Sequence, residues 1–100
     1  ELAHKPGLIV SVSSGRGGSY PVAELRMSGY KNNHICFIPE HVIVSHVTNL
    51  LNSDEESGED DKYIRNRIQY ALNILSSYTK ALNPIRNELL SDLSEFPYGM

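Results

Sequence analysis

The chain has 100 residues with a net charge of −3, and 40% of them are hydrophobic. This length allows one small domain of ordinary globular composition, and the excess of acids disfavours a nucleic-acid partner. A single cysteine, Cys36, excludes a disulfide framework and favours a reducing compartment, so we expect a cytoplasmic protein.

The first four residues hold neither an initiator methionine nor a signal-peptide pattern, which favours the interior of a longer protein. No apolar run approaches the ~20 residues of a membrane span, and we therefore expect no membrane partner.

Residues 7–13 form a nearly continuous apolar and β-branched run, which predicts a parallel strand buried on both faces. The Ser/Gly segment 13–18 then predicts a loop at the carboxyl end of that strand. A helix is expected to begin at about Pro21 and to stop at Gly29, because proline suits a first helical turn and glycine suits a helix end.

A second short strand is expected over residues 34–38, ended by Pro39, and Cys36 within it is interpreted as a buried, inert small hydrophobe. Residues 41–47 fit either extended chain or strand. The order strand, helix, strand is typical of a parallel β-α-β unit.

The acidic segment 52–61 is predicted to be a loop, and Asp60 or Asp61 is expected to cap a long helix. Asn83-Pro84 is expected to cap and restart a final helix, and residues 96–100 form a tail. Apolar residues repeat at helical spacing along these helices. They are Ile64, Ile68, Ala71, Leu72, Leu75 and Tyr78, followed by Ile85, Leu89, Leu90 and Leu93. The first group fits core packing on the sheet or a dimer face.

Two strands do not make a self-sufficient parallel sheet, because at least one edge stays open. The remaining strands are therefore expected from elsewhere, most simply from a missing amino-terminal segment.

The strand, loop and helix together resemble one known family. The segment 5–15, Lys-Pro-Gly-Leu-Ile-Val-Ser-Val-Ser-Ser-Gly, is followed by Gly17-Gly18 and by Leu25-Arg26. This pattern is similar to the NADPH-dependent FMN reductase family, and Phe37-Ile38-Pro39 looks like the next strand of that family. The resemblance covers roughly residues 5–80 and only the second half of the family's domain.

The resemblance implies an α/β fold of the flavodoxin-like type, a three-layer sandwich with a parallel sheet ordered 2-1-3-4-5. Residues 1–100 would be the carboxyl-terminal half of one such domain and supply its last two strands and the following helices. The family's phosphate-binding loop and its isoalloxazine-binding segment would lie in the missing amino-terminal half.

The implied activity is that of an FMN-dependent NAD(P)H oxidoreductase, a flavin/quinone-type reductase with FMN and NADPH as cofactors. Its partners would be FMN, NAD(P)H, the missing half of the domain and further copies in a homodimer or tetramer. The alternative is a non-enzymatic half-domain or subunit that binds a partner through its open sheet edge.

The candidate flavin-binding residues are those of the loop: Ser13, Ser14, Gly15, Arg16 and Gly17. Their hydroxyls and backbone amides suit the polar rim of a flavin, and glycine permits close approach. A plain strand-to-helix turn is the competing interpretation, and Arg16 fits either a nucleotide phosphate or solvent. No catalytic side chain and no metal site are expected, because the histidines and the cysteine lack ligand spacing.

Overall fold

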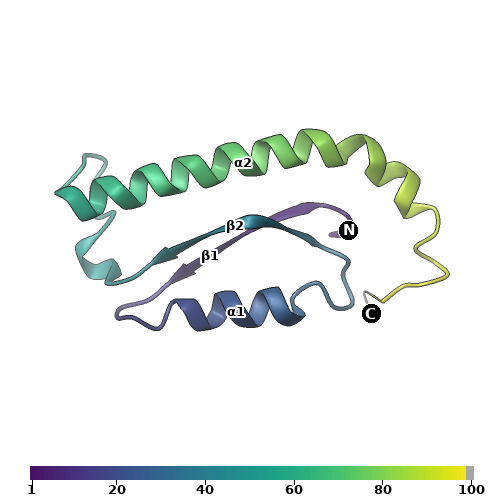
Figure 1. Ribbon diagram of the computed structural model, residues 1–100, viewed down its shortest axis with the longest axis horizontal. Coiled ribbons are helices and arrows are strands. Elements are labelled where there is room, and N and C mark those ends of the chain that lie inside the picture. Colours follow the sequence, from purple (N-terminus) through teal and green to yellow (C-terminus); the bar gives the residue numbers. More distant parts are fainter. Residues whose placement is uncertain (99–100) are drawn as a thin grey trace.

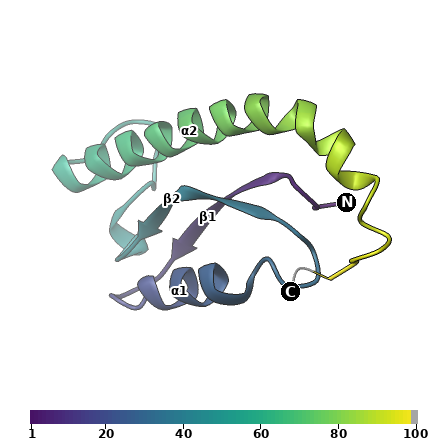
Figure 2. The same cartoon turned by 45° about the vertical axis from the view of Figure 1, so that its right-hand side comes forward.

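The computed structural model describes residues 1–98 and shows a mixed α/β arrangement. Its elements, in order, are β1 (Pro6–Val12), α1 (Ser19–Ser28), β2 (Cys36–Val44), the short 3-10 helix η1 (Val47–Asn49) and α2 (Glu59–Leu90). The two strands pair in parallel. Figures 1 and 2 show α1 on one face of this sheet and α2 on the other. The predicted β-α-β order and parallel pairing are confirmed.

Strand β1 matches the predicted segment to within one residue, and within residues 1–98 its carboxyl half is buried on one face only. Ile9 is buried, whereas Val10 is 53% exposed and Val12 is 60% exposed. Successive side chains of a strand point to opposite faces, so only the face that carries Ile9 is covered here. Helix α2 covers Val42 of β2 on the other face and leaves Val10 and Val12 open.

Strand β2 does not end at Pro39, as expected from the sequence, but runs through it to Val44. The pairing shifts between Gly7, opposite Phe37, and Ile9, opposite His41, so β2 bulges around its proline. Proline is tolerated at a bulge because no ladder hydrogen bond is required there.

Cys36 is exposed rather than buried, which corrects the sequence-based interpretation. It is the first residue of β2, at the amino-terminal end of the strand. Its position at the strand end, and not its apolar neighbours in sequence, decides its exposure.

Helix α1 begins at Ser19 and ends at Gly29, whose N–H donates to the carbonyl of Leu25, and this confirms the predicted stop. Helix α2 begins after Gly58, so the prediction that Asp60 or Asp61 caps it is wrong. Both aspartates lie in its first turn instead, where acids favour the positive end of the helix dipole.

The expected break of the last helix at Pro84 is also wrong, because α2 continues through it to Leu90. A proline inside a helix removes one hydrogen bond and crowds the preceding turn, which a bend relieves. Figure 1 shows that α2 bends toward its carboxyl end.

The core lies between the sheet and the first half of α2, where Val42, Val44, Ile64 and Ala71 are buried. Ile64 and Ala71 of the predicted stripe therefore pack on the sheet, whereas Leu72 is 46% exposed. The later stripe is covered less, because Ile85 and Leu89 remain exposed. The last two residues of the predicted tail lie outside the described residues.

Candidate functional site

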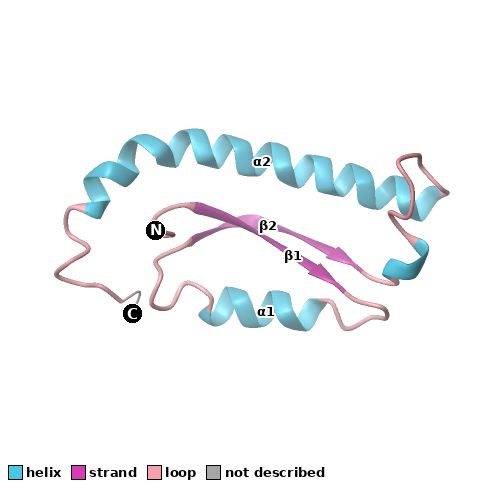
Figure 3. Ribbon diagram, turned by 180° about the vertical axis from the view of Figure 1, so that it is seen from behind, coloured by secondary structure: helices cyan, strands magenta, loops and turns pink. Residues whose placement is uncertain are grey.

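The loop 13–18 follows β1 at the end of the sheet where the carboxyl ends of both parallel strands lie (Figure 3). Its first residue is held on both sides by backbone hydrogen bonds. The N–H of Ser13 donates to the carbonyl of Val44 at 2.9 Å, and its own carbonyl accepts from the N–H of Val47 at 3.1 Å. The loop therefore leaves the sheet in a fixed direction.

The next residues form a tight turn. The hydroxyl of Ser13 donates to the carbonyl of Gly15 at 2.8 Å. The same carbonyl accepts the N–H of His46 at 3.4 Å, which ties the turn to the segment after β2. The hydroxyl proton of Ser13 thus maintains the turn, so this side chain would meet a ligand through its remaining lone pairs.

The glycines of this loop differ in whether the packing of the chain requires them. A Cβ atom on Gly18 would lie 2.7 Å from Cγ2 of Ile43, so Gly18 is required for the packing of α1 on the sheet. A Cβ on Gly15 or Gly17 would meet no atom of the described residues within 4 Å. Neither of these two glycines has a positive φ. Neither packing nor backbone conformation within residues 1–98 thus explains them, and the space above them is free for a ligand.

All five residues proposed from the sequence, Ser13 to Gly17, lie together in this one turn. Ser14, Arg16 and Gly17 are exposed, and Ser13 and Gly15 are partly covered. The turn therefore presents one free hydroxyl, one guanidinium and an open stretch of backbone at the carboxyl edge of the sheet.

A neighbouring hollow of about 350 Å³ was missed by the sequence analysis. It lies beyond the end of β2. It borders the loop 13–18, because the N–H of His46, a lining residue, donates to the carbonyl of Gly15. His46 has a left-handed φ of 52°, a conformation that costs energy in a non-glycine residue and is often found at functional sites. Its lining residues are Ile43, Ser45, His46, Asn49, Leu50, Asp60, Tyr63 and Ile64.

The single buried carboxylate of residues 1–98 lies outside this hollow. Asp61 is 1% exposed and accepts hydrogen bonds from the N–H of Leu51 at 2.7 Å, the N–H of Ser57 at 3.0 Å and Nε of Arg65 at 2.7 Å. These bonds, that from Leu51 most and that from Arg65 next, lower the pKa of the Asp61 carboxyl. At neutral pH Asp61 is therefore ionised, and its hydrogen bonds fix the acidic loop.

Within residues 1–98, no group of three or more His, Cys, Asp or Glu side chains is arranged to hold a metal ion. None of the helices in this part of the chain combines the length and apolar character required to cross a bilayer.

No family model, curated protein or solved structure gives a significant match to the chain.

Proposed function

We propose that this chain is the carboxyl-terminal half of a flavodoxin-like domain in an FMN-dependent NAD(P)H oxidoreductase of the flavin/quinone reductase type. The main support is the loop 13–18, which lies open at the carboxyl edge of a parallel sheet. Ligands of open α/β sheets bind beyond this edge. The free space over Gly15 and Gly17 gives a planar ring room to approach the backbone.

The loop residues fit the edge of a flavin in the following roles. Gly15 and Gly17 would leave the ring in contact with the backbone, and the Ser14 hydroxyl would hydrogen-bond its polar rim. Arg16 would face either solvent or the phosphate of the pyridine nucleotide. When bound, FMN supplies the hydride chemistry, so the chain contributes position and electrostatics rather than a catalytic side chain.

Gly15→Val tests this role in the intact protein. We expect FMN affinity to fall at least ~10-fold, about 1.4 kcal/mol, because the branched side chain fills the space assigned to the ring. The free energy of unfolding should change by no more than about 0.5 kcal/mol, since a Cβ at Gly15 meets no neighbour within 4 Å. Fluorescence titration with FMN and urea unfolding of the apoprotein provide the two measurements.

Ser76→Val on the exposed face of α2 is the matched control, and it should leave FMN affinity unchanged. Equal FMN affinity of Gly15→Val and the parent protein would exclude the loop from the flavin site.

We further propose that the active form is a homodimer or tetramer, with the flavin sites near subunit boundaries. Two-fold assembly is the commonest solution for soluble oligomers. Initial-rate measurements are expected to give parallel double-reciprocal lines, because nicotinamide and acceptor would use the same face of the site in turn. Intersecting lines would contradict the shared face, and light scattering that shows a fully active monomer would contradict the assembly.

The second candidate function is a non-enzymatic half-domain that binds a partner through its sheet edge. The exposure of Val10 and Val12 beside the unpaired side of β1 favours it. Colour separates the two functions: purified intact protein with flavin absorbance supports the oxidoreductase, whereas a colourless protein that does not take up added FMN supports the binding module.

A further inference from the structure

Polar side chains from two elements converge on the hollow beyond the end of β2. They are Ser45, His46 and Asn49 from the segment after the strand, and Asp60 and Tyr63 from the start of α2. None of these side chains forms a hydrogen bond or a salt bridge with another residue of the range 1–98. Their polar atoms are therefore free to bind a molecule that enters the hollow.

The remaining wall of the hollow is apolar. Ile43, Leu50 and Ile64 complete the lining, and Ile64 is only 4% exposed. The ring of Tyr63, which is 68% exposed, adds an aromatic surface at the rim. A volume of about 350 Å³, apolar and aromatic walls and a few polar groups are typical of binding sites for small molecules.

Hydrogen bonds hold the segment after β2 in place without a ligand. The N–H of Val47 donates to the carbonyl of Ser13 at 3.1 Å. The N–H of Leu51 donates to the buried carboxylate of Asp61 at 2.7 Å. The segment is therefore fixed to the end of β1 on one side and to α2 on the other, and a ligand would lose little affinity to the ordering of the site.

The charge of the lining selects the kind of ligand. Among the lining residues of the described chain, Asp60 is the one acid, and no lysine or arginine is present. The acidic loop 52–61 ends at this position, so the rim attracts a cation and repels a phosphate or a carboxylate. Tyr63 follows Asp60 by three residues in α2, which places both side chains on one helix face. An aromatic ring beside a carboxylate suits a cation that is attached to a flat ring.

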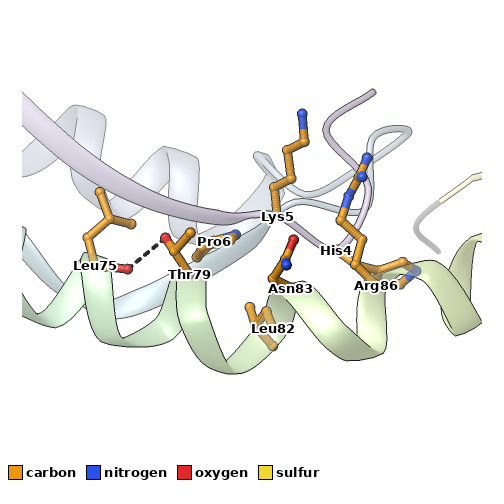
Figure 4. A pocket seen from close by; sticks show the side chains of 8 residues that line it. All are labelled: His4, Lys5, Pro6, Leu75, Thr79, Leu82, Asn83 and Arg86. Carbon is orange, nitrogen blue, oxygen red and sulfur yellow. Dashed lines mark hydrogen bonds between the residues drawn. The ribbon is translucent and has the colours of Figure 1, made fainter.

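A second hollow, at the beginning of β1, has the opposite charge (Figure 4). Its volume is about 260 Å³, its lining includes Lys5 and Arg86, and none of its lining residues is acidic. Arg86 already donates to the carbonyls of Ala3 at 3.0 Å and Glu1 at 3.2 Å, so it holds the chain that enters β1. This hollow disfavours a cation and provides an internal comparison for the hollow beyond β2.

We propose that the hollow beyond β2 is a binding site for a small aromatic molecule that carries a positively charged amine. The amine would pair with Asp60, and the ring would lie against Tyr63 and the apolar wall. Ser45 and Asn49 would form hydrogen bonds with the edge of the ring. The site goes beyond the proposed function and does not depend on it, because no lining residue belongs to β1 or to the loop 13–18.

Tryptamine and indole-3-acetate test the site in the intact protein, because they share one ring system and carry opposite charges. In titrations followed by nuclear magnetic resonance, tryptamine should bind at least ~10-fold more tightly than indole-3-acetate. The amide signals of Ser45, His46 and Asn49 should shift as tryptamine binds. Equal affinities, no binding of tryptamine at millimolar concentration, or shifts confined to the surroundings of Lys5 and Arg86 would each overturn the proposal.

Substitutions at the two α2 residues test where the probe lies. Asp60→Asn and Tyr63→Ala should each weaken tryptamine binding at least ~3-fold, because one removes the carboxylate and the other the ring. Glu59→Gln is the matched control for the first, since Glu59 is an exposed acid in the same helical turn that does not line the hollow. Tyr20→Ala, at a position 78% exposed on α1, is the control for the second. A variant that binds tryptamine as its control does would exclude that contact and with it the proposed site.

Flavin content is a separate readout of the same protein. A colourless protein that binds tryptamine in the hollow would retain this site and reject the oxidoreductase. A yellow protein that does not bind tryptamine would reject this site and leave the oxidoreductase in place.

Discussion

At the scale of single residues, Asp61 has the most demanding environment of the chain. Its carboxylate is buried and accepts hydrogen bonds from the N–H groups of Leu51 and Ser57 and from Arg65. Arg65 in turn donates to the carbonyl of Ser53 at 2.5 Å. One ionised side chain therefore connects the acidic loop to the first turn of α2.

Asp61→Asn should loosen this loop and lower the stability of the intact protein at neutral pH. The lowered pKa of Asp61 contributes stability that is fully present above the unfolded-state value of about 3.9 and is lost as the pH falls through the lower folded-state pKa. The stability difference between parent and variant should thus be constant above about pH 5 and should shrink below about pH 4. Urea unfolding between pH 3 and pH 7 measures it.

Asp60→Asn is the matched control, since Asp60 is exposed and carries the same charge in the same helical turn. If the two variants unfold alike at every pH, the carboxylate of Asp61 does not hold the loop.

At the scale of elements, Arg26 links α1 to the bulge of β2. Its guanidinium donates to the carbonyls of Ile38 and Glu40 and lies 3.3 Å from Nδ1 of His41. The bulge frees these carbonyls from the ladder, and Arg26 replaces the missing donors.

Arg26→Met should therefore destabilise the intact protein by about 1–3 kcal/mol, because two partly buried carbonyls lose their donor. Arg16→Met is the control, since Arg16 is exposed and makes no hydrogen bond or salt bridge to the described residues. Urea unfolding of both variants compares them, and equal stabilities would show that water satisfies the bulge as well as Arg26 does.

The elements also show what local sequence can predict. The strand over residues 7–13 and the helix stop at Gly29 follow from local patterns, and the structure confirms both. The sequence predicts breaks at Pro39 and Pro84, yet a bulge accommodates the first proline and a bend accommodates the second. A proline forbids one hydrogen bond, and only the tertiary structure decides whether the element ends there.

The candidate site likewise has one part that local sequence predicts and one part that it does not. The Ser/Gly loop is contiguous in sequence, so its place after a strand was predictable. The adjacent hollow was not, because it brings His46 together with Tyr63 from a helix seventeen residues later. No short-range pattern records that contact. Likewise, only the positions of neighbouring atoms show that packing requires glycine at position 18 and does not require it at position 15.

At the scale of the whole molecule, residues 1–98 form an open rather than a closed structure. The radius of gyration is 16.2 Å, whereas a compact domain of this length is expected near 13 Å. The buried apolar side chains are few. They are Ala3, Ile9, Val22, Ile38, Val42, Val44, Ile64 and Ala71. One face of β1 and much of α2 stay exposed, so little apolar area is removed from water per ordered residue.

If the chain is half of a larger domain, as we propose, the 100 residues on their own should unfold without a sharp transition, and the protein that contains them should unfold cooperatively. For the isolated chain we expect a urea m-value below about 1 kcal/mol/M, since m-values scale with the surface exposed on unfolding and small domains reach about 1–3 kcal/mol/M. Circular dichroism and fluorescence should also give transitions that do not coincide.

Dilution separates this outcome from self-association, because a transition stabilised by pairing of copies depends on protein concentration. A monomeric, concentration-independent transition with an ordinary m-value would show that the two strands and two helices are sufficient. The open edge of β1 would then be a property of the finished fold, and the amino-terminal half would not be needed to complete it.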